Sequence, residues 1–296
     1  MSTTKKIIIA ALILILVGAI ITTVTMCRNN WNVPGSVNSN KVSQTYEITE
    51  NFDSLYMKVE TADVSFVPSN NSRCTIIISD NENTTYNVGV KNRTLCIEKL
   101  KQSGFYVEFG SPTVVVYLPR TEYKDLNAIG STGNIDIPSA FSFNRIDVEM
   151  TTGDISCNAS ASESISLRVS TGEIDLSSTS AKDIYLHVST GKIEAKDVNC
   201  STFSSDGSTG RIELEDVLVS GLMRIKRSTG DVRLDKCDAG EIEIETRTGD
   251  ISGSLRSEKI FIARSDTGRI EVPETLTGGK CKIISDTGNI NITIDR

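Results

Sequence analysis

Residues 170–193, STGEIDLSSTSAKDIYLHVSTGKI, contain one complete repeat of the pattern that decides the fold of this 296-residue chain. A Thr-Gly pair opens the stretch and returns near its end. The pair recurs through the C-terminal part of the sequence every 19 to 20 residues or so, and regular self-similarity on this scale is the signature of a solenoid. The pairs are Thr132-Gly133, Thr152-Gly153, Thr171-Gly172, Thr190-Gly191, Thr209-Gly210, Thr229-Gly230, Thr248-Gly249, Thr267-Gly268 and Thr287-Gly288.

Apolar residues keep fixed places around each pair. The second residue after the glycine is always isoleucine or valine, and the fourth is mostly apolar. Before the glycine, apolar residues stand at the seventh and fifth places, as Ile184 and Leu186 do. Alternation with a period of two is typical of a strand with one buried face. Each repeat is therefore predicted to be a strand, a tight Thr-Gly corner, a second strand and a looser return.

Stacked repeats of this kind predict an all-β fold, a parallel β-solenoid with right-handed winding and a length of roughly 40 Å. The glycine serves as the bend residue, because a residue without Cβ tolerates unusual φ and ψ. By strand parity the corner threonines are predicted to point inward as a structural ladder. The coil that ends at Ile294 is predicted to be the exposed end, with Asp295 and Arg296 placing charge at its edge.

The region before these repeats reads as an N-terminal β cap with a hairpin insertion. Thr61-Ala62-Asp63-Val64 looks like a degenerate corner with alanine in the glycine place, so the stack is expected to begin before residue 126. Strand-like runs follow it at Cys74 to Ile78, Tyr86 to Val90, Leu95 to Ile97, Phe105 to Phe109 and Thr113 to Leu118.

A run of 20 uncharged, mostly apolar residues from Ile7 to Met26 is long enough to span a bilayer. Lys5 and Lys6 precede it and Arg28 follows it, which favours a cytoplasmic N-terminus and an extracytoplasmic remainder. A cleaved signal peptide is the alternative, but no small-x-small site closes the run. The predicted segments are a cytoplasmic tail (1–6), a transmembrane anchor (7–26), a linker (27–45), an N-terminal coil and hairpin cap (46–125) and the solenoid repeats (126–296).

Charge and cysteine content exclude several function classes. The formal net charge of −7 is spread along the chain without a basic block, so nucleic acid is an unexpected partner. The seven cysteines form no CxxC pair and no zinc spacing, and we expect neither a metal site nor a cofactor. Buried free thiols are the favoured reading, while a bridge between Cys74 and Cys96 stays open.

The motifs Ser-Thr-Gly-Asn-Ile (131–135), Thr-Thr-Gly-Asp-Ile (151–155), Ser-Thr-Gly-Glu-Ile (170–174) and Ser-Thr-Gly-Asp-Val (228–232) resemble a bacterial β-strand-repeat family named "putative adhesins", which includes LiaG-like proteins. Val-Val-Val-Tyr-Leu-Pro at 114–119 resembles the lead-in strand of that family. The resemblance covers the chain from about residue 46 to its end. It implies a β-solenoid at the bacterial envelope, often joined to an N-terminal membrane anchor, without established biochemical activity.

Catalysis has weak support in the sequence. Glycoside hydrolysis, the chemistry of many β-helix enzymes, needs two carboxylates at a set separation. The outward carboxylates three residues after the glycines follow the rhythm of the repeat, which is typical of a solvated face. We expect Lys192 and Arg211 to neutralise the neighbouring acids without a bound metal ion. The only histidine, His187, occupies an outward polar place and has no nucleophile elbow near it. The acidic places are Asp136, Asp175, Glu194, Glu213 and Glu271.

The sequence thus favours a non-enzymatic binding or scaffold module at the cell membrane, single-pass, with its C-terminal domain outside. The expected partners are an envelope polymer, another protein or a second copy of the chain. An envelope-stress regulator acting through a membrane partner is the alternative from a different class. A polysaccharide-active β-helix enzyme is the third and weakest candidate.

Overall fold

The computed structural model describes residues 41–71, 73–100 and 111–295, which belong to one compact unit. These residues are all-β, with 19 strands joined in one sheet. In the described part of the chain no helix is long and apolar enough to cross a membrane. The anchor predicted at residues 7–26 and the run predicted at 105–109 lie outside the described residues.

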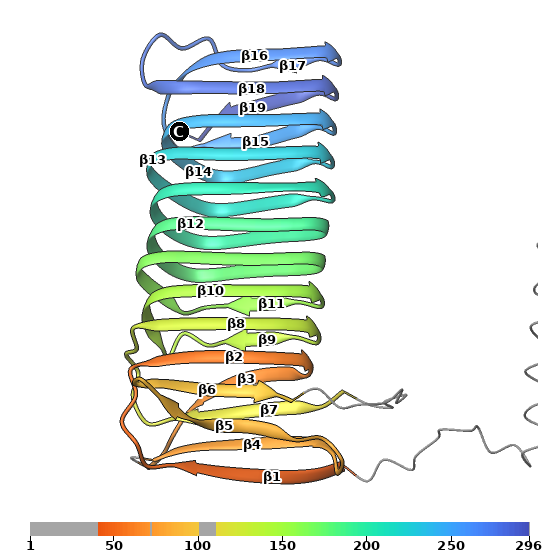
Figure 1. Cartoon of the computed structure of the whole chain (residues 1–296). Helices are drawn as coiled ribbons and strands as arrows, with labels where there is room; N and C mark the ends of the chain where they lie inside the picture. The colour runs from red at the N-terminus through yellow and green to blue at the C-terminus, as the bar shows by residue number, and fades with distance from the viewer. Residues whose placement is uncertain (1–40, 72, 101–110, 296) are drawn as a thin grey trace, which may run out of the picture. The chain divides into compact units, whose positions relative to one another are not determined.

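The predicted solenoid is confirmed by parallel pairing between successive coils (Figure 1). Each Thr-Gly corner joins two strands of one coil and stacks in register on the next corner, so that Thr132 lies opposite Thr152 and Thr152 opposite Thr171. The regular coils are formed by β8 (Asp125–Thr132), β9 (Ile135–Ile137), β10 (Ser142–Thr152), β11 (Ile155–Cys157), β12 (Ser160–Thr209), β13 (Ile212–Thr229), β14 (Val232–Thr248) and β15 (Ile251–Leu255).

The corner glycines have the unusual backbone that the parity change predicted. Their φ angles are all positive, from 124° at Gly153 to 156° at Gly268, a region essentially confined to glycine. Space is a second constraint, because a Cβ at Gly210 would overlap the backbone carbonyl of Gly191 in the coil below. Glycine is therefore required both by conformation and by the closeness of the stacked corners.

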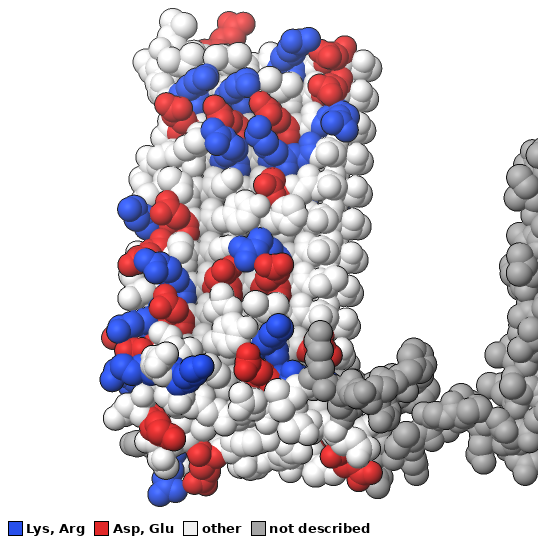
Figure 2. All heavy atoms as spheres, in the orientation of Figure 1, with Lys and Arg blue, Asp and Glu red and all other residues white. Residues whose placement is uncertain are grey.

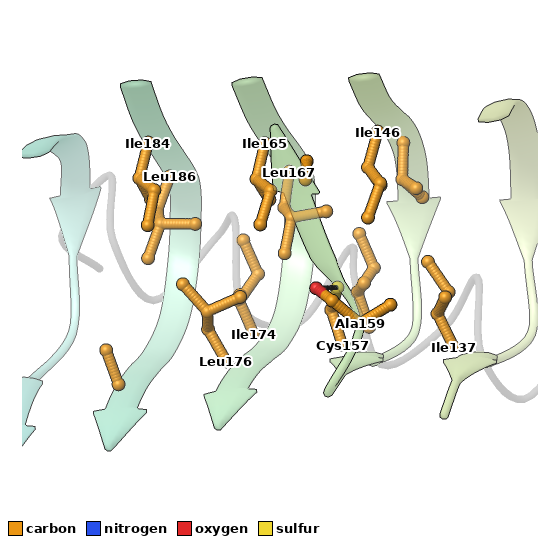
Figure 3. Close-up of a cluster of buried hydrophobic side chains, with 14 of the residues drawn as sticks. Ile137, Ile146, Cys157, Ala159, Ile165, Leu167, Ile174, Leu176, Ile184 and Leu186 are labelled. Atoms are coloured by element: carbon orange, nitrogen blue, oxygen red, sulfur yellow. Dashed lines mark hydrogen bonds between the residues drawn. The ribbon is translucent and has the colours of Figure 1, made fainter. Parts of the chain in front are cut away.

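The core runs through the inside of the coils as columns of aliphatic side chains. Ile146, Ile165 and Ile184 come from successive coils and lie in one such column (Figure 3). Ile137 and Leu176, from strands that follow corners, face them across the interior. These side chains are at most 2% exposed, and full burial of such a side chain contributes about 1.5 to 3 kcal/mol.

One column contains a charge that the sequence pattern did not predict. At the third place before the glycine, Val169 and Val188 are followed by Gly207 and then by Arg227. The Arg227 guanidinium is 5% exposed and donates to the Val188 carbonyl at 2.7 Å. It occupies the space left by Gly207, because a Cβ there would meet its terminal nitrogen. Burial lowers the pKa of Arg227 from its usual value.

The stack begins before residue 126, as the degenerate corner predicted. β2 (Ser54–Thr61) and β3 (Asp63–Pro68) form a coil that pairs with β8 and β9, and Thr61 lies opposite Thr132. The next coil in sequence, β6 (Thr94–Lys99) and β7 (Thr113–Leu118), lies on the other side of it. The β6–β7 coil therefore lies on the cap side of the β2–β3 coil, and the chain then crosses to the other side of β2–β3 to form β8 and β9.

Three antiparallel strands close this end as a cap: β1 (Lys41–Ile48) and β4 (Cys74–Asn81) extend the β7 side, and β5 (Tyr86–Lys91) pairs with β6. Inside the cap the Lys99 ammonium lies 3.1 Å from the Asp80 carboxylate, and the Tyr86 hydroxyl donates to the same carboxylate at 2.7 Å. Cys74 and Cys96 lie in strands that do not pair with each other, and both are free thiols.

The predicted order of coils at the C-terminal end is wrong. β18 (Gly279–Thr287) and β19 (Ile290–Ile294) pair with β14 and β15 on one side and with β16 (Lys259–Thr267) and β17 (Ile270–Glu271) on the other. The last coil in sequence is thus inserted beneath the preceding one (Figure 1). The segment 256–258 between β15 and β16 carries the chain past one coil position, and the segment 272–278 between β17 and β18 brings it back, which sequence order does not predict.

We predict that Gly210→Ala destabilises the fold by about 3 kcal/mol or more, since the new Cβ meets a positive φ and a neighbouring carbonyl together. Gly89→Ala is the matched control, because a Cβ there meets nothing within 4 Å. Chemical denaturation followed by circular dichroism measures both changes. Equal midpoints for the two variants would contradict the role given to the corner glycine.

Candidate binding surface

The corner threonines face outward, contrary to the prediction of an inward ladder. All nine are exposed, and together we call them the threonine edge. The inward alternation holds up to the third place before the glycine and then breaks, because pairing skips the next residue, as at Thr151 between the paired Met150 and Thr152. The chain leaves the flat sheet there and carries the threonine onto the outer side of the corner.

The hydroxyls of the threonine edge are not used by the fold. The corner is held by backbone groups: the Gly210 amide donates to the Thr229 carbonyl at 2.8 Å, and the Gly230 amide donates to the Thr248 carbonyl at 2.8 Å. Within the described residues no protein group pairs with a corner threonine hydroxyl. Each hydroxyl is thus a spare donor and acceptor facing solvent.

A second ladder, which sequence reasoning missed, runs beside the threonine edge at the residue after each glycine. The Asn134 side-chain oxygen accepts from the Asp154 amide at 3.0 Å, and the Asp154 carboxylate accepts from the Glu173 amide at 2.8 Å. The ladder resumes at Asp231, whose carboxylate accepts from the Asp250 amide at 3.0 Å. Recurrence of Asn or Asp directly after Thr-Gly was its signal in the sequence.

Lys192 and Arg211 interrupt this ladder in the middle of the rod, where a surface hollow is lined by residues including Asp175, Glu194 and Glu213. The Lys192 ammonium pairs with Glu194 and lies 2.9 Å from the Glu213 carboxylate in the next coil. Arg211 lies 3.2 Å from the same carboxylate. The two cations thus pair with the acidic row as the sequence analysis expected.

This pairing changes the acidity of the groups involved. Hydrogen bonding to Lys192 lowers the pKa of Glu213, with a smaller contribution from Arg211. Hydrogen bonding to Glu194 and then to Glu213 raises the pKa of Lys192. Both shifts favour the charged forms at neutral pH. Figure 2, which shows one face of the rod, likewise has acidic and basic side chains intermixed, without a continuous patch of either sign.

The other acids of the row form no ion pair with Lys192 or Arg211 within the described residues, although Asp175 lines the same hollow. Asp136 is exposed. Asp175 accepts from the Ser177 hydroxyl at 2.5 Å, and Glu271 pairs with Arg269 at 3.5 Å on the outermost coil. Among the residues described, no group of three potential metal ligands comes together.

His187 makes contacts that the sequence did not predict. Its Nδ1 contacts the Asp206 carboxylate in the next coil, and its Nε2 lies 3.0 Å from the Ser189 hydroxyl. The arrangement has the order of a Ser-His-Asp triad. All three residues, however, lie in the strand β12 at places that recur in every coil, whereas a nucleophile is exposed on a strained turn in hydrolases of the nucleophile-elbow type. We assign these contacts to the polar outer face.

The thiols that the structure describes offer no reactive site. Five of the six described cysteines are buried and all six are free, which confirms the favoured reading. Burial raises the pKa of Cys74, Cys157, Cys200 and Cys281 to about 12 and that of Cys237 to about 11. Thiols of this kind are inert, because the thiolate is the nucleophile.

The architecture is that of a β-solenoid with stacked Thr-Gly corners. The chain belongs to the Toastrack DUF4097 family, whose model matches residues 52–293. This confirms the resemblance to bacterial "putative adhesins". Among curated protein sequences, none matches this chain.

The chain is similar to solved structures, one of which shows the same fold. A "putative lipid binding protein" from Parabacteroides distasonis is similar with a TM-score of 0.57 and 16% identity, over 87% of this chain and 99% of that one. A "putative adhesin" from Bacteroides fragilis has a TM-score of 0.45 and 13% identity, over 86% of this chain and 97% of that one. Neither of these two descriptions names an enzymatic activity.

We predict that Lys192→Gln moves the pKa of Glu213 up toward its ordinary value, about 4.3 in a model peptide. In the wild type the lowered pKa stabilises the fold above that ordinary value, and this contribution is lost as the pH falls through the folded-state pKa. Carboxyl titration by NMR measures the shift. Lys196→Gln is the control, because Lys196 pairs with Glu215 at 2.8 Å instead. An unchanged Glu213 in Lys192→Gln would contradict the assigned pairing.

Proposed function

We propose that this protein is a membrane-anchored, extracytoplasmic binding and scaffold module of the cell envelope that contacts an extended polymer through its threonine edge. The observation that supports this proposal is the one-dimensional array of identical, exposed hydroxyls without protein partners. Neighbouring rungs are separated by the spacing of hydrogen-bonded strands, about 4.8 Å.

A repeated surface suits a repeated ligand. One exposed hydroxyl contributes little, because its hydrogen bond to a ligand replaces a bond to water. A polymer that engages several rungs gains from effective concentration, since every contact after the first is intramolecular. The hollow in the middle of the rod is open to solvent and lined by ion-paired residues such as Lys196 and Glu215. Such surroundings suit an elongated, hydroxyl-rich partner better than an enclosed small molecule.

The anchor rests on the apolar run from Ile7 to Met26 and on the lysines before it. β1 follows this segment in sequence and lies in the cap, at the end of the stack opposite to β16. An N-terminal anchor would hold the cap nearer to the membrane and leave the coils beyond it to face the envelope. The description of one structural neighbour as lipid binding is compatible with this location.

For the topology, we predict that a cysteine introduced at Ser36 is labelled by a membrane-impermeant maleimide added to intact cells. A cysteine introduced at Thr3 should be labelled only after permeabilisation, because Lys5 and Lys6 hold the N-terminus inside. Both variants are made in a chain with Cys27 and Cys96 replaced by serine. The reverse labelling pattern would exclude the proposed orientation.

For the threonine edge, we predict that the triple variant Thr190→Val, Thr209→Val and Thr229→Val binds purified bacterial cell-wall sacculi at least tenfold more weakly than the wild type. Valine keeps the shape of threonine and removes only the hydroxyl, so thermal stability should stay nearly unchanged. Co-sedimentation at increasing sacculus concentration gives the affinity.

The matched control removes three exposed hydroxyls on the return side of the coils, in Ser162→Ala, Ser180→Ala and Ser220→Ala. Its binding should equal that of the wild type. If the wild type does not bind sacculi, or if both triple variants lose binding equally, the threonine edge is not the polymer-binding surface.

A further inference from the structure

The two ends of the solenoid differ. At the N-terminal end the coils are covered by the antiparallel strands β1, β4 and β5, with β1 paired only to β4 among the described strands. At the other end a regular coil is left uncovered, because β16 pairs only with β18 and β17 only with β19 in the described structure. The outermost coil therefore presents a row of unpaired backbone donors and acceptors, which is a template for another strand.

Apolar side chains surround this open edge. Ile260 and Ile262, on the outer face of β16, are 46% and 51% exposed, and Leu276 in the following loop is 94% exposed. Ile270, at a place that is buried in every other coil, is 40% exposed because no coil covers it. Terminal repeats of solenoids normally carry a polar outer surface for solubility. An apolar end of this kind marks an interaction site.

We propose that this end is a two-fold interface between two copies of the chain, in which β16 pairs antiparallel with β16 of the second copy. A two-fold contact satisfies both open edges at once and closes, so that it ends at a dimer. Stacking the open end on the cap of another copy would leave one open end unsatisfied and would continue as a filament.

The sequence of β16 selects one register for this pairing. Residues that lie opposite each other in antiparallel strands point to the same face of the sheet. The two-fold axis must therefore lie midway between two copies of the same residue. With the axis at Phe261, Ile260 lies opposite Ile262 of the second copy. Glu258 then lies opposite Arg264, so both the apolar and the charged neighbours match.

The adjacent registers fail by charge. An axis at Ile260 places the charged Glu258 opposite the apolar Ile262 of the second copy, and an axis at Ile262 places Glu258 opposite Asp266. Directly opposed like charges destabilise a strand pair. In the Phe261 register, Glu258 is exposed and accepts from the Thr277 hydroxyl of its own chain with one carboxylate oxygen, which leaves the other for the partner. Arg264 is exposed and lies 3.0 Å from its near neighbour Asp266, so it too is accessible.

The two-fold rotation of the proposed dimer also gives the exposed loop after β17 a partner. It reverses the strand direction, so the loop that follows β17 in one copy comes to lie over the corner side of the other. Leu276 would then approach the uncovered Ile270 of the partner. Phe261, which is only partly buried in one copy, would be covered by its counterpart.

The test is sedimentation equilibrium of the full chain in a mild detergent. The wild type is expected to be a dimer, and Ile262→Lys is expected to raise the dimer dissociation constant at least tenfold with an unchanged circular dichroism spectrum. Ile129→Lys is the matched control, because Ile129 is a similarly exposed isoleucine, at 39%, near the other end of the rod. It should remain dimeric.

Charge reversal tests the register without depending on the apolar variant. Glu258→Arg should weaken the dimer about 1.4- to fivefold, the range for an exposed pair of 0.2 to 1 kcal/mol. Adding Arg264→Glu should restore the wild-type affinity. A monomeric wild type, an assembly that grows beyond two copies, or a dimer that Ile262→Lys leaves intact would overturn the proposal. A charge reversal that the second substitution does not rescue would overturn the register.

Discussion

The contact on which the rest of the structure depends is the close approach of each corner to the corner below it. The carbonyl of one corner glycine occupies the space in which the next glycine would carry a Cβ, as Gly191 does for Gly210. This contact holds successive turns at strand spacing, and the amide of each glycine can then reach a neighbouring threonine carbonyl. Register, core columns and surface ladders all follow, because every residue in a coil keeps its place relative to the corner.

The same constraint produces the surface. Since the chain leaves the sheet two residues before the glycine, the threonine is carried outward, and the strict repeat turns one exposed hydroxyl into a line of them. In the Asn and Asp ladder beside it, the side-chain oxygens accept hydrogen bonds from backbone amides of the next coil, as the Asp154 carboxylate does from the Glu173 amide. The corner threonine hydroxyls make no such bond within the described residues, so they remain available to a ligand whereas the Asn and Asp side chains do not.

The ends of the rod show how a repeat protein controls its own length. At one end three antiparallel strands and the buried Lys99–Asp80 pair close the stack. At the other end the chain skips a place and inserts β18 and β19 beneath β16 and β17. The outermost coil is then the one with exposed isoleucines, and the polar residue Asp295 lies away from the open edge, with its amide bonded to Leu255. In the proposed dimer the two caps would lie at opposite ends of a doubled rod.

The sequence by itself determined the solenoid, its period, the corner glycines and the buried columns, because each depends on local backbone conformation and on an alternation that repeats every coil. It also indicated the early coil at Thr61-Ala62 and the pairing of Lys192 and Arg211 with the acidic row. The tertiary structure alone decided which way the threonines face, since parity breaks at a corner and its geometry depends on the coil below. It alone decided the position of Arg227, whose burial requires the gap at Gly207 in another coil. The order of the last two coils was likewise beyond sequence reasoning, because two coils with the same repeat can stack in either order and only their packing distinguishes the two.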